Sequence, residues 1–197
     1  MNEPPPQPYA DRAATAAAFA AHVNRGKVAT FERYGIELVM GAREGVRFKD
    51  AFSGREFYNC HCNGGVFNLG HRHPAIVEAT AEALAGGLDI GNHHFVSGYR
   101  AQLAERLAAT TGGRLSGVVF GVSGGEAVDL AIKVARARTG RQAVLSVSGG
   151  YHGHTGLALA AGDAQYRAPF GPNLPAFRQL PFGDLAAIDA AVDDDTA

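Results

Sequence analysis

The chain has 197 residues, 46% of them hydrophobic, and a formal net charge of −1 from 18 Lys and Arg against 19 Asp and Glu. This composition is typical of a soluble globular protein with a sizeable core, and its scattered basic residues give no electrostatic reason to expect nucleic acid or a membrane surface as a partner. The N-terminal stretch resembles neither a signal peptide nor a membrane span, and two neighbouring cysteines are too few for a disulfide framework. We therefore expect a cytoplasmic protein that handles a small ligand.

The first third of the chain predicts a helix followed by a small antiparallel meander. An alanine-rich run over residues 10–23 predicts a surface helix. Residues 35–59, GIELVMGAREGVRFKDAFSGREFYN, then alternate apolar and polar side chains between two turn signals, at 41–45 and at 53–54.

The remaining two thirds predict helices and then an alternation of strands and helices. Helical spacing of apolar residues occurs over 75–87 and again over 99–113. Three elements follow: a strand at 115–122 (LSGVVFGV), a helix over about 126–138, and a strand at 142–148 (QAVLSVS). Strand, helix and strand with short connections predict an α/β fold with a mostly parallel sheet and covering helices. The last segment predicts a helix capped by Asp184, after which another strand would be expected, so we expect a fragment.

A glycine-rich turn precedes the helix in VVFGVSGGEAVDLAIKVARARTG, residues 118–140. Ser123, Gly124 and Gly125 offer a hydroxyl and unhindered backbone amides at the positive end of a helix dipole, a site suited to an anion such as phosphate. The turn lacks both the Lys-Ser/Thr ending of a P-loop and the spacing of a dinucleotide fingerprint. The alternative is a turn that only joins strand to helix. Apolar residues share one helix face: Ala127, Leu130, Ala131 and Val134.

A second turn, GGYHGHTG, follows the next predicted strand and carries Tyr151 and His152. Because ligands of parallel sheets bind at the carboxyl ends of strands, we expect both turns to face one crevice. An aromatic ring beside a phosphate site suits a flat phosphorylated ring. The alternatives are that Tyr151 is a rim or core aromatic and that His152 is a structural histidine.

From about Gly35 onward the chain resembles the N-terminal part of a class III, pyridoxal-phosphate-dependent aminotransferase of fold type I. The resemblance rests on ordered matches: GVRFKDAFSGREFYN, GGVFNLGHRHPAIVEA, LAERLA, FGVSGGEAVDLAIKVARARTGR, GGYHGHT and FGPNLP. It implies that residues 1–58 form an N-terminal arm and meander belonging to a small domain, and that residues 59–197 form the first part of the large, cofactor-binding domain.

The resemblance also implies a cofactor, pyridoxal 5'-phosphate, and roles for individual residues. Ser123, Gly124 and Gly125 would bind its phosphate, Tyr151 would stack on its ring, and His152 would lie beside it. A homodimer is implied, in which the region GNHHFVSGYR (91–100) approaches the partner's cofactor.

Two positions depart from the family pattern. Gly125 stands where family members usually have Ser or Thr, which removes a hydroxyl from the phosphate site. His154 stands where ornithine- and acetylornithine-type members carry Arg, and an imidazole cannot grip a substrate carboxylate bidentately. The second departure disfavours those substrates.

The catalytic lysine of the family has no counterpart in this chain. Fold type I catalysis needs a lysine bonded to the cofactor and a carboxylate on the ring nitrogen, and in the family both lie beyond this segment. The lysines present are Lys27, Lys49 and Lys133, and none matches the catalytic position. We expect the N-terminal portion of an enzyme that transfers an amino group from an amino acid or amine to a 2-oxo acid, with this portion inactive alone.

Other functions remain open at this stage. One is a non-catalytic truncated product that binds cofactor or a full-length partner, and others are the decarboxylase and aminomutase chemistries that the family also includes. Metal binding is a rival interpretation, but the spacing of the candidate ligands matches no known zinc motif. Small buried side chains are a better explanation of the two cysteines in this set. The candidate ligands are Cys60, Cys62, His71, His73, His93 and His94.

Overall fold

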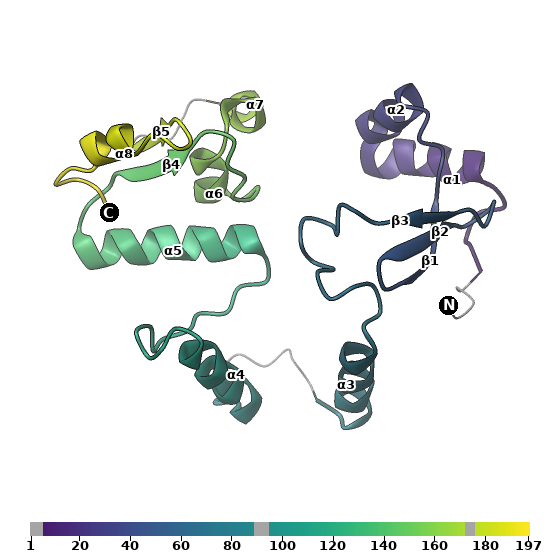
Figure 1. Ribbon diagram of the computed structural model, residues 1–197, viewed down its shortest axis with the longest axis horizontal. Helices are drawn as coiled ribbons and strands as arrows, with labels where there is room; N and C mark the ends of the chain where they lie inside the picture. The colour runs from purple at the N-terminus through teal and green to yellow at the C-terminus, as the bar shows by residue number, and fades with distance from the viewer. Residues whose placement is uncertain (1–5, 89–94, 172–175) are drawn as a thin grey trace. The chain divides into compact units, whose positions relative to one another are not determined.

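The computed structural model describes residues 6–88, 95–171 and 176–197. The chain divides into two units, Met1–His93 and His94–Ala197, and each contains its own sheet (Figure 1). The predicted division between residues 1–58 and 59–197 concerns the domains of a complete enzyme, so it stays a prediction.

The first unit contains helices and the predicted meander. Its elements are α1 (Arg12–Phe19), the π-helical segment η1 (Ala20–Asn24), α2 (Arg25–Arg33), β1 (Met40–Glu44), β2 (Arg47–Asp50), β3 (Glu56–Tyr58) and α3 (Pro74–Ala85). The three strands pair antiparallel in the order β1-β2-β3, which confirms the meander. The second helix was not predicted, and it begins because the Asn24 side chain accepts a hydrogen bond from the Lys27 N–H at 2.8 Å.

A buried carboxylate, Asp50, connects α1 to the meander. Asp50 is 2% exposed, and its oxygens accept hydrogen bonds from the Ser53 hydroxyl at 2.6 Å, the Val39 N–H at 2.7 Å and the Arg12 guanidinium at 2.7 Å. Burial alone would raise the pKa of Asp50, but the hydrogen bonds from Ser53, Val39 and Arg12 outweigh it and hold this pKa well below its ordinary value. The charged form of Asp50 is therefore part of the folded state.

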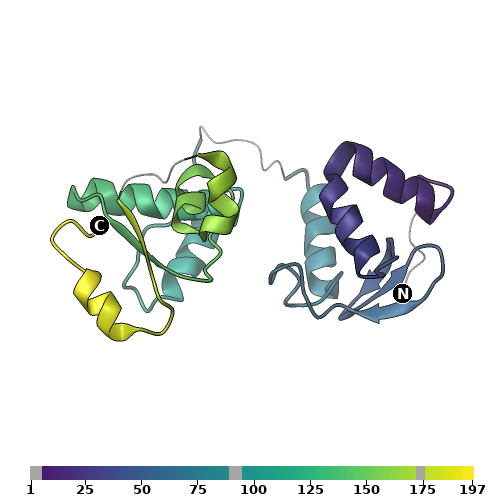
Figure 2. The ribbon, with the colours of Figure 1, turned by 90° about the horizontal axis from the view of Figure 1, so that it is seen from above.

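The second unit contains a parallel strand pair with helices around it. Its elements are α4 (Gly98–Ala109), α5 (Gly124–Thr139), β4 (Val144–Val147), α6 (Gly156–Ala161), α7 (Ala164–Arg167), the 3₁₀ turn η2 (Ala168–Phe170), β5 (Phe177–Leu180) and α8 (Leu185–Ala191). Strands β4 and β5 pair in parallel, from Val144 opposite Phe177 to Val147 opposite Leu180. Figures 1 and 2 show α5 beside this pair, and the Arg136 guanidinium lies 5.1 Å from the centroid of the Phe177 ring. The predicted strand–helix alternation is thus confirmed for β4 and the helices on either side.

The predicted strand at 115–122 is wrong. These residues form no strand, and among the described residues none pairs with them in a ladder. A β-strand needs hydrogen-bond partners on a neighbouring strand, and apolar content alone does not supply them. The start of β4 is instead joined by the end of the chain, where the Ala143 N–H donates to Asp195 O at 2.9 Å and the Ala197 N–H donates to Ala143 O at 2.8 Å.

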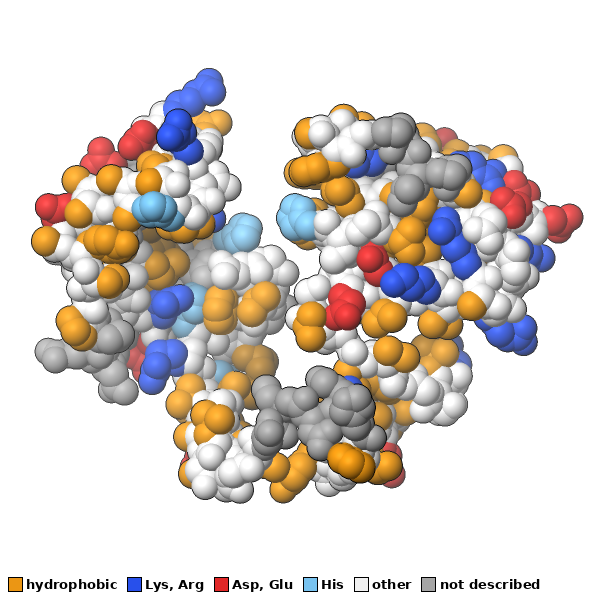
Figure 3. Space-filling model, turned by 180° about the vertical axis from the view of Figure 1, so that it is seen from behind, with side chains coloured by type: hydrophobic (Ala, Val, Ile, Leu, Met, Phe, Trp, Pro, Cys, Tyr) orange, Lys and Arg blue, Asp and Glu red, His pale blue; other side chains and the backbone are white. Residues whose placement is uncertain are grey.

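Both units expose much apolar surface (Figure 3). The accessible surface is 14564 Å², whereas two separate globular units of about 10 kDa each would expose about 10,700 Å² together. The helix faces that periodicity identifies as apolar are among the exposed ones: Ile76 and Leu84 on α3, Leu103 and Leu107 on α4, and Val134 on α5. On α5 the buried residue is Ile132, on a different face from the one predicted. None of the helices formed by the described residues is both long and apolar enough to cross a bilayer.

Candidate active site

The turn before α5 is built by a reciprocal cap. Ser123 is the N-cap, with an extended backbone (φ −152°, ψ 163°), and its hydroxyl oxygen accepts a hydrogen bond from the Glu126 N–H at 3.2 Å. The Glu126 carboxylate in turn accepts one from the Val122 N–H. At the other end Gly140 closes the helix in the left-handed conformation, with φ 73°. The helix and its start therefore follow from residues adjacent in sequence.

The first two amides of α5 are available to a ligand. No described residue accepts a hydrogen bond from the N–H of Gly124 or Gly125. The hydroxyl of Ser123 accepts from Glu126, so its proton remains free to be donated. Two amides and a hydroxyl at a helix N-terminus are the donor set that an anion requires.

The turn before α5 contacts the turn after β4. A Cβ placed on Gly153 would lie 2.5 Å from the Cα of Gly125, so the two backbones approach as closely as only glycines allow. Gly153 also has a φ of 133°. A Cβ placed on Gly125 would lie 3.1 Å from the hydroxyl oxygen of Thr155. The two turns that the sequence analysis expects at one crevice are therefore neighbours, although their binding role stays a prediction.

A partly buried hydrogen bond links the elements that follow the two turns. An Asp129 carboxylate oxygen on α5 accepts from the Ala158 N–H on α6 at 2.7 Å. Ala158 is fully buried and Asp129 half-buried, so this bond is partly shielded from water. It links the helices that follow the two turns.

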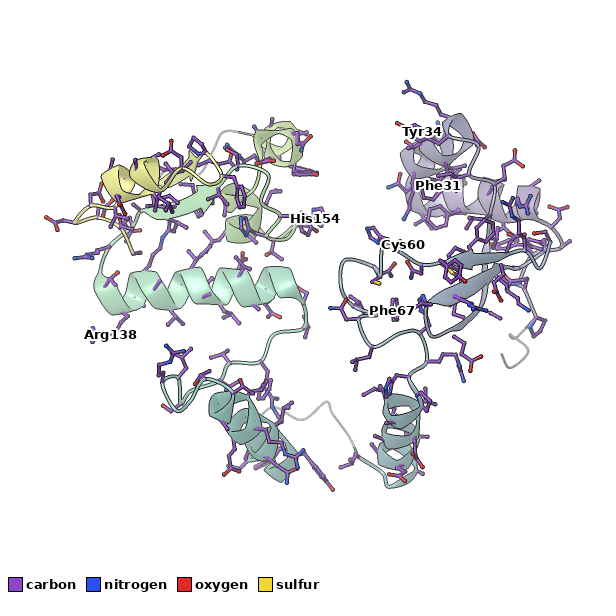
Figure 4. The ribbon with its side chains drawn as sticks, in the orientation of Figure 1. Phe31, Tyr34, Cys60, Phe67, Arg138 and His154 are labelled. Atoms are coloured by element: carbon purple, nitrogen blue, oxygen red, sulfur yellow. The ribbon has the colours of Figure 1, made fainter. Side chains whose placement is uncertain are left out.

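Tyr151 lies on the exposed side of this site. Tyr151 is 63% exposed, and its ring centroid lies 5.4 Å from that of His154 and 6.2 Å from that of Tyr166, both edge to face. Figure 4 shows His154 projecting from the loop between β4 and α6. The exposed ring surface of Tyr151 is available to a planar ligand.

His152 is placed differently from its neighbour. Its ring folds back toward Gly150, where a Cβ would lie 2.8 Å from Nε2. That Nε2 is buried and has no hydrogen-bond partner among the described residues. The structure thus places His152 within the loop beside Tyr151, and its role toward a cofactor remains a prediction.

Three residues of this site were missed by the sequence analysis. Gly153 lies against Gly125 where the turns meet, Thr155 lies beside Gly125, and Asp129 bonds α5 to α6, yet none was assigned a role. The run of glycines around Tyr151 and His152 was a signal for a close backbone approach, but the partner of that approach lies about thirty residues away, which local spacing does not reveal.

The rival metal site finds no support among the described residues. No group of three or more His, Cys, Asp or Glu side chains there could hold a metal ion. His71 Nε2 instead lies 2.8 Å from the side-chain amide nitrogen of Asn59, and the His71 and Phe67 ring centroids are 4.3 Å apart. Burial, and to a smaller extent the charge of Arg43, lowers the pKa of His71. Cys60 and Phe67 lie on the loop between β3 and α3 (Figure 4), whereas the candidate ligands His93 and His94 lie outside the described residues.

None of the three lysines belongs to either turn in the sequence. Lys27 and Lys49 belong to the first unit, where Lys27 lies 5.7 Å from the Phe31 ring centroid. Lys133 is on α5, about 14 Å along the helix axis from Gly124, toward the end where Figure 4 shows Arg138.

Comparison with known sequences identifies relatives over most of the chain. A sequence profile described as aminotransferase class-III matches residues 31–196. A protein of Archaeoglobus fulgidus described as an uncharacterized aminotransferase is 57% identical over 180 residues, which are 91% of this chain and 42% of that protein. The acetylornithine aminotransferase of Methanopyrus kandleri is 38% identical over 169 residues, which are 85% of this chain and 42% of that protein.

Solved structures match the fold. The ornithine aminotransferase from Toxoplasma gondii ME49 aligns with a TM-score of 0.82 at 22% identity, covering 96% of this chain and 45% of that one. A thermostable (S)-enantioselective omega-transaminase from Thermomicrobium roseum aligns with a TM-score of 0.74 at 28% identity, covering 90% of this chain and 43% of that one. The chain thus has the fold of these type I aminotransferases and spans less than half the length of each of these four relatives.

Proposed function

Because the chain belongs to the class III aminotransferase family, we propose that it supplies the cofactor-phosphate site of a pyridoxal-phosphate-dependent aminotransferase. The observation that carries the proposal is the contact between Gly125 and Gly153. It brings two helix amides, which have no acceptor among the described residues, next to the loop with an exposed tyrosine ring. Family membership makes pyridoxal 5'-phosphate the cofactor to test at this site.

The residues of the two turns fit that cofactor. The N–H groups of Gly124 and Gly125 and the hydroxyl of Ser123 would donate to the phosphate, and the Tyr151 ring would stack on the pyridine face, with His152 beside it. When bound, the cofactor supplies an electron sink for bonds to the substrate's α-carbon. The chain's own part is to bind and orient it. The absence of a hydroxyl at Gly125 leaves backbone amides as donors there.

We further propose an amino acid or amine as amino donor and a 2-oxo acid as acceptor. The curated relatives include an acetylornithine aminotransferase, and a solved relative from Bifidobacterium kashiwanohense is a taurine:2-oxoglutarate aminotransferase in complex with PLP and glutamate. His154, whose ring centroid lies 5.4 Å from that of Tyr151, stands where ornithine- and acetylornithine-type members of the family carry an arginine that can grip a substrate carboxylate. The proposal therefore disfavours ornithine-type donors. A homodimer and a cytoplasmic location belong to the same proposal.

The experiment is cofactor binding and amino transfer by the natural full-length protein, followed by borohydride reduction and peptide mapping. We expect stoichiometric binding, transfer between an amino donor and a 2-oxo acid, and one labelled lysine outside residues 1–197. The same measurements on residues 1–197 alone should show no turnover and no single labelled lysine. Labelling of Lys27, Lys49 or Lys133 with turnover would overturn this division of roles. A natural protein that is itself truncated and binds the cofactor or a full-length partner without amino transfer would favour the non-catalytic alternative.

A further inference from the structure

The loop that carries Tyr151 is fixed at its base by a side chain from the next connection. Asp163 precedes α7, and one of its carboxylate oxygens, Oδ1, accepts hydrogen bonds from the Gly149 N–H at 3.0 Å and from the Gln179 side-chain amide at 2.6 Å. Gly149 begins the loop after β4, and Gln179 lies on β5. A single oxygen thus connects the loop, the α6–α7 connection and the neighbouring strand.

The Asp163 side chain does not cap the helix that it precedes. An aspartate at the N-cap of a helix normally accepts a hydrogen bond from an amide in the first turn. Asp163 is the N-cap residue of α7, yet its side chain makes no such bond and turns to Gly149 and Gln179 instead. Capping α7 therefore does not explain this aspartate, whereas holding the loop does.

The same connection also contacts the far side of the loop. Tyr166, on α7, meets the Tyr151 ring at a centroid distance of 6.2 Å and an interplanar angle of 78°. At the base, the Ser148 N–H donates to Leu180 O at 2.8 Å, so the strand end itself is anchored to β5. Between Gly149 and Tyr151 the loop is thus held at both ends by residues 163 and 166.

We propose that Asp163 is a positioning residue of the cofactor site, which fixes the loop bearing Tyr151 through its Oδ1 and thereby sets the placement of the stacking ring. Tyr166 supports the same loop through its contact with the Tyr151 ring. The inference rests on the proposed function, because it assumes that Tyr151 faces the cofactor. It adds a residue whose hydrogen bonds, among the described residues, go to the loop and to β5 rather than to the phosphate turn.

The geometry separates two substitutions of Asp163. In Asp163→Asn the amide oxygen can occupy the Oδ1 position and accept from both donors, so both hydrogen bonds are retained without the charge. In Asp163→Ala both hydrogen bonds are lost. A matched control is Asp189→Ala, because Asp189 is an exposed carboxylate on α8 for which the described residues show no hydrogen bond.

The test compares these variants in the natural full-length protein by two measurements. In the apoprotein, hydrogen exchange of the peptide containing residues 149–155 should be faster in Asp163→Ala and unchanged in Asp163→Asn and Asp189→Ala. With pyridoxal 5'-phosphate, Asp163→Ala should bind about tenfold more weakly, the loss expected for a hydrogen bond in such a site, and should show altered visible circular dichroism of the bound cofactor. Asp163→Asn should restore both.

The outcomes separate this inference from the proposed function. Wild-type affinity and circular dichroism in Asp163→Ala would overturn the positioning role, and so would an Asp163→Asn variant as impaired as Asp163→Ala. A wild-type protein that does not bind the cofactor would overturn the proposed function itself. Faster exchange and weaker binding in Asp163→Ala, with rescue by Asp163→Asn, would support the inference.

Discussion

Replacing Gly124 by Asp separates anion binding from folding, because the substitution should weaken cofactor binding without lowering the free energy of unfolding. A Cβ placed on Gly124 meets nothing within 4 Å beyond its chain neighbours and its own helix backbone, so the protein accommodates a side chain there. A carboxylate in the first turn of α5 favours the helix by about 0.3–1 kcal/mol, and removing a glycine restricts the unfolded chain by about 0.4–1 kcal/mol more. The free energy of unfolding of the apoprotein should therefore stay the same or rise.

The cofactor affinity should fall. A carboxylate about 4 Å from one unit of phosphate charge costs about 4 kcal/mol at an effective dielectric constant of about 20. Allowing for solvent screening at an exposed turn, we take a loss of about 3 kcal/mol in binding free energy, which corresponds to a roughly 100-fold larger dissociation constant. The matched variant Gly124→Asn has nearly the same shape without the charge, so its cofactor affinity should fall roughly tenfold or less.

The assay is titration of the apoproteins with pyridoxal 5'-phosphate, at low and at high ionic strength, together with thermal unfolding without cofactor. The difference in affinity between the Asp and Asn variants should shrink as salt screens the repulsion. Equal affinity of wild type and Gly124→Asp would refute the anion site and leave the turn as a connection between strand and helix. A Gly124→Asp protein less stable than the wild type would refute the reasoning about folding.

Three further predictions concern other residues. Tyr151→Ala should weaken cofactor binding and alter the visible spectrum of the bound cofactor, while Tyr151→Phe should preserve both, since stacking uses the ring face; equal damage in an absorbance titration would point to the hydroxyl instead. Gly153→Ala should destabilise the second unit by about 1–3 kcal/mol or more, because its φ of 133° is strained for alanine and its Cβ would lie 2.5 Å from the Cα of Gly125; an unchanged melting temperature would contradict the close approach. Because the pKa of Asp50 is lowered on folding, its contribution to stability should be fully present above the unfolded pKa of about 4 and decline as the pH falls from there toward the folded pKa. In urea unfolding at several pH values, Asp50→Asn should abolish this part of the pH dependence of the free energy of unfolding. The same pH dependence in wild type and variant would argue against it.

The strongest predictions from sequence were those whose causes lie within a few residues. The start and end of α5 follow from Ser123, Glu126 and Gly140, and the start of α8 follows from Asp184, whose side chain accepts from the Ala187 N–H at 2.9 Å. The meander was likewise readable, because alternating side chains and two turn signals lie next to each other in the chain.

The predictions that were wrong or incomplete depended on partners elsewhere. Residues 115–122 have the composition of a strand but no strand to pair with among the described residues. Periodicity identified an apolar face on α5 that includes Val134, yet Val134 is 59% exposed and Ile132 is the residue buried. Composition shows that a face is apolar, while what covers it depends on elements distant in the chain.

For the candidate site, the sequence alone was sufficient to nominate Ser123, Gly124, Gly125, Tyr151 and His152, because a capped glycine turn and an aromatic loop are local patterns. It also placed both turns at one crevice, but it did not reveal the residues through which they contact each other. The contact of Gly125 with Gly153 and the turning of Asp163 toward Gly149 bring together groups separated by 28 and 14 positions. Such contacts are set by the parallel pairing of β4 with β5 and by the packing of α5 on α6, since residues distant in the sequence meet only after those elements have come together.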